Sequence, residues 1–443
     1  MMAKLGKWRI LRKGRLPMPA ARFINVFRME ESIVKLHYGS LYWPSTRPNP
    51  PAYPQLLEPV RCHALVIGGG MSGIACGYTL VRSGIDAVLI EQGTIASGST
   101  AANTGLLQYS NDIMLSELAK QIGDEDAVEF YRACKNAVEQ LVQVANGLPR
   151  DVDLKRRSSF YFASSESDLP SLRREHEMLD RHGFGVEWWD ADRIESVFPF
   201  RKSGAIVTHG DAELNPFLFV TSLAESAAQA GLRIYEKTSA LSVEGDKGNF
   251  IVRTNHGEIH AEHIVYAVGY TPESAGDARV NARFTRTYAI ATKPIRHSLS
   301  NWHQRFMLWE TARPYLYLRT TNDDRIIVGG LDENNRQPVL TDTDLKQRSR
   351  RLLTELRLLF PDLEAEAEYE WCGTFAESAD NLPWIGEDPG TPGRYYALGY
   401  GGNGTIYSAI AARLIRDDIM GIKHPIASIV SPARPKHKKA ASR

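Results

Sequence analysis

Two glycine-rich turns hold the residues of this chain that are best suited to bind an anionic ligand. The first turn runs from Gly68 to Gly73 with the spacing G-x-G-x-x-G, directly after a short apolar run, His63–Ile67. A helical pattern follows it, and a second apolar run, Ala87–Ile90, ends in the acid Glu91. This order of strand, glycine turn, helix, strand and acid is typical of a dinucleotide-binding unit. The alternative is a glycine turn in another kind of βαβ unit.

Each position of the first turn has a physical role if the ligand is a dinucleotide. Gly68 allows the tight turn, Gly70 lets the backbone approach a pyrophosphate, and Gly73 lets the helix pack closely on the strand. The N–H groups at the start of the helix offer a partial positive charge to the phosphates. The Glu91 carboxylate lies where it would accept hydrogen bonds from the ribose hydroxyls of adenosine. We therefore predict cofactor contacts at Gly68, Gly70, Met71, Ser72, Gly73 and Glu91.

The second glycine-rich turn, residues 399–405 with the sequence GYGGNGT, repeats this arrangement near the end of the chain. It follows a predicted strand, Tyr395–Leu398, and precedes a long helical pattern of small residues. Because the first turn already accounts for a pyrophosphate, a second helix N-terminus indicates another site where negative charge develops. Reduced flavin is such a group, since its pyrimidine end carries the charge, whereas a nicotinamide protein has no need of this turn. We expect the two turns to converge on opposite ends of one flavin nucleotide.

Two further segments are predicted to lie along the same cofactor. Residues 92–105 follow Glu91 and are rich in small and hydroxylated side chains, which suit the pyrophosphate and the edge of the flavin ring; the alternative is a plain flexible loop. The strand His263–Gly269 ends in glycine, as a strand does where it passes close to an extended ligand, although an ordinary turn explains that glycine equally well. The contacts predicted here are Gln92, Ser97, Gly98, Ser99, Thr100, Asn103, Thr104 and Gly269.

The composition is that of an ordinary globular protein. The chain has 443 residues, 43% hydrophobic and 24% charged, and its net charge of +1 favours no charged partner, so no nucleic acid is expected. Four scattered cysteines without C-x-x-C spacing indicate neither a disulfide framework nor a zinc site, so we expect no metal and a cytoplasmic location. No apolar run approaches the roughly 18 residues of a membrane helix.

Both ends of the chain and a proline-rich segment are expected to lie outside the core. Residues 1–28 are basic and contain no acid before Met29. They are interpreted as a disordered extension or as a start codon assigned too early, in preference to a transit peptide. Residues 43–59 are proline-rich, so they should form no helix and lie extended on the surface. Residues 422–443 are expected to form a disordered basic tail.

The middle of the chain is rich in predicted strands and aromatic residues, which favours a substrate-binding domain. Strand alternation places Tyr315, Tyr317 and Arg319 on one face, where the Arg319 guanidinium could pair with a substrate carboxylate. The alternative is a surface arginine beside two packing tyrosines. Tyr288 is a further candidate, and Arg319, Tyr317 and Tyr288 make up the predicted substrate site. Strands are predicted over 283–295, 306–320, 325–331 and 366–375, and helices over 112–146, 213–230 and 341–360.

With both glycine turns placed, the chain resembles the D-amino acid oxidase-like family of FAD-dependent oxidoreductases. The resemblance rests, in order, on LVIGGGMSG, ASGSTAANTG, HIVYAVG, DNLPWIG and ALGYGGNG, and YWPSTRPNPPAYPQL resembles the leading segment of its glycine oxidase and gamma-glutamylputrescine oxidase-like branch. It implies an α/β fold in which a Rossmann-like FAD-binding domain carries an inserted, β-sheet-rich α+β substrate domain. The division implied is an extension at 1–41, FAD-binding parts at 42–115, 196–275 and 371–421, shared elements at 116–195, a substrate domain at 276–370 and a tail at 422–443.

The resemblance also implies site residues and a reaction. Ala240, or a neighbour in 238–241, would contact the adenine through its backbone, and Gly401, Gly402, Asn403, Gly404 and Thr405 would hold the pyrimidine end of FAD. Many relatives have histidine in place of Asn403. Cys372 matches poorly the cysteine that binds FAD covalently in some relatives, so noncovalent FAD is expected.

The implied reaction is hydride transfer from the carbon beside an amine to flavin N5, which gives an imine that hydrolyses. The expected partners are a small amine or amino acid and oxygen or another electron acceptor. The alternatives are a flavoprotein without catalysis, such as an assembly subunit, and a nicotinamide-dependent dehydrogenase.

Overall fold

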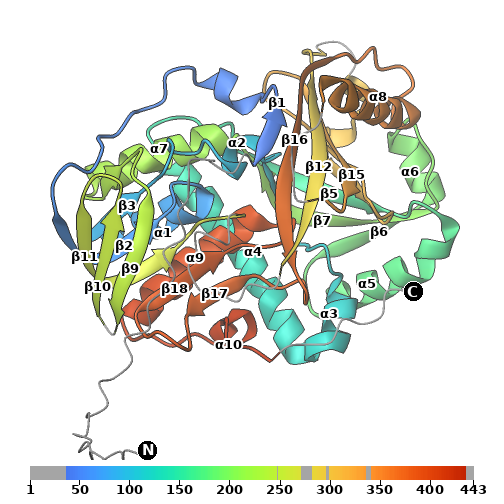
Figure 1. The fold of residues 1–443 in the computed structure, drawn as a ribbon. Coiled ribbons are helices and arrows are strands. Elements are labelled where there is room, and N and C mark those ends of the chain that lie inside the picture. Colours follow the sequence, from blue (N-terminus) through green and yellow to red (C-terminus); the bar gives the residue numbers. More distant parts are fainter. Residues whose placement is uncertain (1–35, 247, 271–281, 296–298, 336–340, 436–443) are drawn as a thin grey trace, which may run out of the picture. The chain divides into compact units, whose positions relative to one another are not determined.

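Two β-sheets and the helices packed on them form the part of the chain that the structure, a computed structural model, describes: residues 36–246, 248–270, 282–295, 299–335 and 341–435 (Figure 1). The basic extension predicted over residues 1–28 lies outside these residues. Among the described residues, no helix combines the length and the apolar character needed to cross a bilayer.

The smaller sheet contains the strand that precedes the first glycine turn. Its order is β17 (Trp384–Glu387), β18 (Arg394–Leu398), β11 (Glu258–Tyr266), β2 (Val60–Ile67), β3 (Ala87–Ile90) and β8 (Arg233–Tyr235), with β9 (Ala240–Asp246) and β10 (Asn249–Thr254) attached to β11. The strands β18, β11, β2, β3 and β8 run parallel. Tyr266 of β11 pairs with Ile67 of β2, which confirms that the glycine-ended strand lies beside the first strand.

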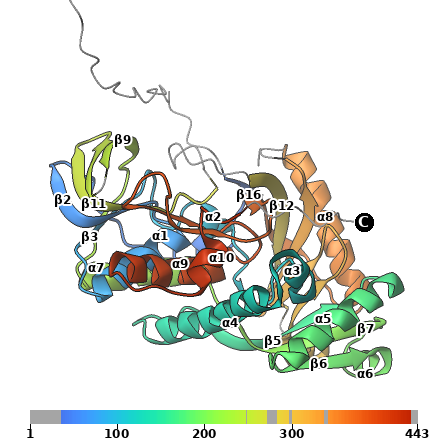
Figure 2. The ribbon, with the colours of Figure 1, turned by 90° about the horizontal axis from the view of Figure 1, so that it is seen from below.

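Helices cover the smaller sheet and bring the two glycine turns together. Helix α1 (Met71–Arg82) follows the first turn and packs against α9 (Gly404–Ile419), which follows the second, and against α7 (Pro216–Gln229) (Figure 2). The single helix predicted over 112–146 is wrong, because Gly123, at φ +93°, divides it into α3 (Leu115–Ile122) and α4 (Asp124–Asn146).

The helix predicted from residue 213 begins later than expected. It begins only at Pro216, where the Asn215 side chain accepts a hydrogen bond from the N–H of Leu218 and so caps the first turn. Glu213 belongs to the preceding strand instead.

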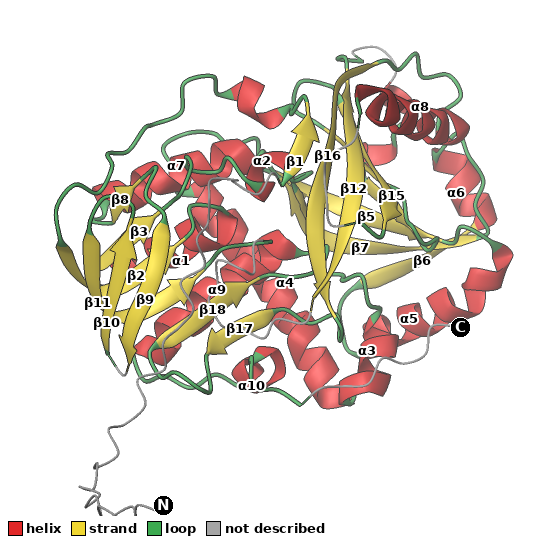
Figure 3. Cartoon of the chain, in the orientation of Figure 1, coloured by secondary structure: helices red, strands yellow, loops and turns green. Residues whose placement is uncertain are grey.

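The larger sheet gathers strands from across the sequence (Figure 3). Helix α8 (Asp342–Leu359) packs on β12, β15 and β16, while α5 (Leu169–Arg181) and α6 (Ala191–Val197) contact β6 and β7. The strand β7 lies within residues 196–275, the range predicted for the FAD-binding domain, but pairs in the larger sheet. The strand order is β1 (His37–Gly39), β16 (Ala367–Ser378), β12 (Ala282–Thr292), β15 (Ile326–Glu333), β14 (Tyr317–Thr320), β13 (Met307–Glu310), β5 (Lys155–Phe162), β7 (Gly204–Glu213) and β4 (Leu106–Leu107), with β6 (Val186–Asp190) paired to β7.

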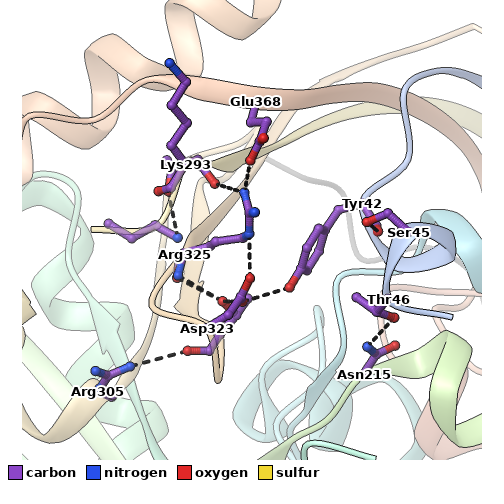
Figure 4. A network of polar contacts seen from close by, with 12 residues as sticks. Tyr42, Ser45, Thr46, Asn215, Lys293, Arg305, Asp323, Arg325 and Glu368 are labelled. Carbon is purple, nitrogen blue, oxygen red and sulfur yellow. Dashed lines mark hydrogen bonds and ion pairs between the residues drawn. The ribbon is translucent and has the colours of Figure 1, made fainter. Parts of the chain in front are cut away.

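Over residues 48–59, the proline-rich segment 43–59 has no helix and is mostly exposed, as predicted from its composition, but its start differs from the prediction. It begins with a short 3-10 helix, Trp43–Thr46, whose Trp43 is only 1% exposed. Tyr42 donates to Asp323 Oδ1 at 2.8 Å and Asn215 Nδ2 donates to Thr46 Oγ1 at 2.9 Å (Figure 4). Proline fixes φ without preventing the neighbouring aromatic side chains from packing, so hydrophobic burial and these polar contacts hold the segment to both sheets.

Two further expectations about loops are corrected. The segment 92–105 contains a one-turn helix, α2 (Ser99–Ala102), and buries Ile95 and Ala101 in the core. The predicted basic tail forms α10 (Ile426–Val430), and Arg434 Nε lies 2.7 Å from Asp380 Oδ2 in a buried ion pair. The remainder of the tail, 436–443, lies outside the described residues.

Candidate cofactor and substrate site

The first glycine turn requires glycine for packing as well as for approach to a ligand. Gly68 has φ +114°, a conformation that side chains rarely adopt. A Cβ added to Gly73 would lie 1.8 Å from the carbonyl oxygen of Gly68, so helix α1 can rest on this turn only without a side chain there. The end of β11 lies beside the turn, because the N–H of Ala267 donates to the Ile67 carbonyl at 2.9 Å. Gly269, two residues further on, has φ +56° with open space at its Cβ position.

Glu91 lies at the end of β3 and forms a hydrogen bond with the first turn. Its carboxylate accepts the backbone N–H of Gly69 and that of Gly93, each at 2.7 Å. Burial raises the pKa of Glu91, and the two N–H donors act in the opposite direction. The N–H of Thr238 donates to the Glu91 carbonyl at 2.8 Å, which brings the segment 238–241, including Ala240, next to this acid. A ribose and an adenine bound at Glu91 would therefore meet the residues predicted for them.

The second turn is held by a different set of contacts. Gly401 N–H donates to the Ala376 carbonyl at 2.8 Å, and Gly402 N–H donates to Asp112 Oδ2 at 2.7 Å. The Asn403 amide donates to the carbonyls of Gln108 and Ser110, at 3.1 and 2.7 Å. The Asn403 side chain thus fixes the segment 108–111. The contact of Gly402 with a flavin stays a prediction, and it would require the Asp112 carboxylate to share or leave this N–H.

One segment, residues 97–105, connects the two turns. Thr100 Oγ1 accepts the N–H of Met71 at 3.0 Å, and Asn103 Nδ2 lies 3.4 Å from Thr405 Oγ1. Helices α1 and α9 also meet directly, with Ser72 Oγ 2.7 Å from Ser408 Oγ (Figure 2). The two turns are therefore neighbours in space, as the sequence predicted.

The larger sheet presents a polar face toward this segment. Leu316 and Leu318 are buried in the core beside α8, which leaves Tyr315, Tyr317 and Arg319 on the opposite face and confirms the predicted alternation. The Trp371 indole on the same side of the sheet donates to the Ala102 carbonyl at 3.0 Å.

Arg319 is buried, so the alternative of a surface arginine is wrong. Its side chain is 2% exposed; Nη1 donates to the Gly105 carbonyl at 2.9 Å and lies 3.8 Å from Glu213 Oε2, while the guanidinium lies 5.1 Å from the Trp43 ring. A role in binding a substrate carboxylate stays a prediction.

Tyr288 lies on the other face of the sheet. It is 1% exposed among the residues that pack beside α8, and its hydroxyl donates to Glu333 Oε2 at 3.0 Å. The structure thus brings Tyr317 and Arg319 together and separates Tyr288 from them.

Comparison with known proteins identifies the family. Residues 63–417 match the family model described as DAO, FAD dependent oxidoreductase. The chain belongs to this family. It is 25% identical over 370 residues to the glycine oxidase of Geobacillus kaustophilus (strain HTA426), covering 81% of this chain and 92% of that protein. It is 25% identical over 395 residues to the gamma-glutamylputrescine oxidoreductase of Escherichia coli (strain K12), covering 87% and 89%.

Another relative and a solved structure agree with this assignment. A protein of Bacillus subtilis (strain 168) that is named for a Rieske 2Fe-2S centre is 26% identical over 401 residues, which cover 89% of this chain and 75% of that protein. The crystal structure of glycine oxidase from Geobacillus kaustophilus superposes with a TM-score of 0.72 at 21% identity, covering 85% of this chain and 100% of that one. The enzyme therefore has the fold of this family.

The residues at the turns fit an extended FAD. Neither N-cap residue, Gly70 of α1 or Asn403 of α9, caps its helix with its own side chain. Thr100 Oγ1 accepts the Met71 N–H of α1, and the remaining N–H groups at both helix starts offer partial positive charge to an anion. A Cβ built on Gly70 would meet only Thr100 Oγ1, at 3.4 Å, so the backbone is open on the side where a pyrophosphate would lie. Residues 70–73 would hold the pyrophosphate, Glu91 the ribose, and residues 401–405 the opposite end of the cofactor.

Two acids beside the polar face of the larger sheet were missed by the sequence analysis. Asp112 accepts the hydroxyl of Tyr315 at 3.1 Å in addition to the N–H of Gly402. Asp332 lies on the sheet face that it shares with Tyr317 and Thr287, and its pKa is raised to about 7, mainly by burial and further by the charges of Asp112 and Glu377. The signal available for Asp332 was the pair Gly329-Gly330 just before it, since glycine within a strand indicates a bulge.

Proposed function

We propose that this FAD-dependent oxidoreductase oxidises the C–N bond of a small amine or amino acid. The support comes from relatives named for glycine and gamma-glutamylputrescine and from one structural observation. The segment 97–105 contacts both glycine turns and, through Gly105 and Ala102, also contacts the polar face of the larger sheet. A cofactor held by the turns would therefore be bordered by Tyr317 and its neighbours.

The protein's part in this reaction is to bind and orient. FAD held by the two turns would supply the acceptor for a hydride from the carbon beside the substrate nitrogen, and water would hydrolyse the resulting imine. The substrate nitrogen must be uncharged to react. The polar residues of the sheet face would hold the amine, and their charges would affect how readily its nitrogen loses a proton. Oxygen or another acceptor then takes the electrons. No strong general base is required of the chain.

FAD is proposed to bind without a covalent bond to the protein. Cys372 is fully buried in the core beside α8, on the strand face opposite that of Trp371. Burial raises the pKa of its thiol to about 11, so the thiolate needed for a bond to the flavin is disfavoured.

The test is anaerobic reduction of the purified flavoprotein by a panel of amines and amino acids. Bleaching of the visible flavin bands by members of the panel supports the proposal, and stopped-flow reoxidation by oxygen then separates an oxidase from a dehydrogenase. A protein that binds FAD but is bleached by no member is a flavoprotein without this activity. Acid precipitation that leaves yellow colour in the pellet would contradict noncovalent binding.

A further inference from the structure

We propose that Asp332 binds an ammonium group of the substrate, and that the site selects amines without a carboxylate beside the reacting nitrogen. This inference rests on the proposed function and narrows it to a class of substrate. Three observations support it: the backbone conformation of β15, a carboxylate oxygen of Asp332 without a hydrogen-bond partner among the described residues, and the charges around that carboxylate.

A β-bulge turns Asp332 toward the substrate side of the sheet. Tyr288 and Arg286 of β12 pair with Gly330 and Glu333 of β15, so β15 has one extra residue between these pairs. Gly330 and Leu331 take φ values of +143° and +60° at this point. In a regular strand the acid would point to the α8 side of the sheet, because side chains alternate.

The neighbours of the bulge show the result of this shift. A Cβ on Gly329 would meet the Tyr317 ring, so this position faces the substrate side. Leu331 and Glu333 instead contact the α8 side, where Glu333 Oε2 accepts the Tyr288 hydroxyl at 3.0 Å. Asp332 thereby joins Tyr317 and Thr287 on the substrate side.

One oxygen of the Asp332 carboxylate, Oδ1, is shielded from solvent and has no hydrogen-bond partner among the described residues. The neighbouring Thr287 hydroxyl lowers the pKa of the acid, but it is a neutral donor and brings no positive charge. An ionised carboxylate only accepts hydrogen bonds, whereas an ammonium group carries three donors and a positive charge. A substrate ammonium would satisfy both the unmet acceptor and the charge.

The charges that face Asp332 favour a cation over a carboxylate. They are Asp112 and Glu377, both acidic, and Arg313. The Arg313 guanidinium donates to the carbonyls of Asp112 and Ala312, each at 3.0 Å, and lies 4.9 Å from the Tyr315 ring. Among the described residues, Asp332 and Asp112 together outweigh the base Arg313, so an α-carboxylate brought here would be repelled while a cationic amine is attracted.

The experiment compares charge-matched ligands on the FAD-loaded protein. tert-Butylammonium carries three N–H donors but has no hydrogen on the carbon beside its nitrogen, so it cannot be oxidised there. Pivalate has the same tert-butyl group with the opposite charge, so calorimetry measures the binding of each without turnover. We expect the cation to bind at least about 10-fold more tightly than the anion, and Asp332→Asn to weaken the cation by about 10- to 100-fold. Glu333→Gln, the adjacent acid on the other face of the sheet, is the matched control and should leave cation binding unchanged.

Steady-state turnover is the second measurement. The KM for 1,4-diaminobutane should rise in Asp332→Asn, whereas flavin content should not change. If amino acids bleach the flavin and bind more tightly than amines, the inference is wrong although the proposed function stands; if no amine or amino acid bleaches it, the proposed function fails first. Should Asp332→Asn fail to fold, preference of the wild-type protein for pivalate over tert-butylammonium would still overturn the inference.

Discussion

Gly70 and Gly73 belong to one turn, but the structure gives them different reasons to lack a side chain. A Cβ on Gly73 would collide with the backbone of Gly68, so the fold itself excludes alanine. A Cβ on Gly70 has room, and its nearest neighbour is Thr100 Oγ1 at 3.4 Å. A methyl group at Gly70 would therefore clash only with a ligand that approaches the backbone there.

Gly70→Ala should therefore separate cofactor binding from folding. The variant should fold with an apoprotein melting temperature close to that of wild type, while its affinity for FAD falls about 10-fold or more, equivalent to about 1.4 kcal/mol. Fluorescence titration of apoprotein with FAD measures this. Gly147→Ala is the control, because a Cβ there makes only ordinary contacts at 3.5 Å. A Gly70→Ala protein that binds FAD as wild type does would show that no pyrophosphate lies against this turn.

The raised pKa of Asp332 predicts that the stability of the protein depends on pH. Its pKa is raised to about 7 in the folded protein, mainly by burial, against about 3.9 in an unfolded chain. Between these values the folded state keeps a proton that the unfolded state releases, so the free energy of unfolding falls as pH rises from about 4 to about 7, by at most about 4 kcal/mol.

The variant Asp332→Asn should not show this fall in the free energy of unfolding, because its amide does not titrate. We expect urea midpoints of the substrate-free protein to match wild type near pH 4 and to exceed wild type at pH 8. A variant that is less stable than wild type at pH 8 would mean that the ionised carboxylate is stabilised by a partner within the protein.

At the scale of elements, Arg319 links β14 to the segment 97–105, which contacts both glycine turns. Its guanidinium binds the Gly105 carbonyl and lies beside Glu213 of β7, and both side chains are 2% exposed. Arg157 Nη2 also lies 2.9 Å from Glu213 Oε1, so this acid would keep one partner if Arg319 were removed.

Arg319→Ala should therefore lower stability and flavin content together, with a loss of about 3 kcal/mol in the free energy of unfolding. A residue that bound a substrate carboxylate would instead raise KM and leave the flavin content unchanged. Denaturant unfolding and the absorbance ratio of flavin to protein, measured on the same preparations, distinguish these outcomes. Arg201→Ala, which removes an exposed arginine paired with Asp192 and Glu195, should change neither quantity.

The sequence predicted elements well where the determinants are local. The run from His63 to Glu91 is contiguous, so its strand, turn and helix could be recognised from spacing, and the structure has each of them. The helix over 112–146 failed at Gly123, whose positive φ a pattern of apolar residues does not reveal. The C-terminal helix α10 was missed because its burial comes from distant contacts with α4 and β17.

At the scale of the whole molecule, the approach of the two glycine turns to each other could be predicted from the sequence, and most of the arrangement of the larger sheet could not. Each glycine turn could be recognised from its local sequence. The two turns were expected to lie close together because one ligand that binds to both requires it. The larger sheet combines β1, β5, β7 and β16, and pairing between such distant segments is not encoded in any local pattern. The bulge that turns Asp332 toward the face of Tyr317 depends on that pairing, so alternation alone placed Tyr317 on its face of the sheet and overlooked the acid.

The proposal that the two turns hold one cofactor from separate parts of the chain predicts that FAD stabilises the protein more than either half of the cofactor does. Saturating FAD at about 100 times its Kd should add about 2.7 kcal/mol to the free energy of unfolding, and it should slow subtilisin cleavage of apoprotein within residues 92–112. ADP and FMN at the same concentration each reach one turn only, so each should give a smaller rise in melting temperature and weaker protection. If ADP raised the melting temperature as much as FAD does, residues 401–405 would lie outside the cofactor site, and the uncapped start of α9 would need another ligand.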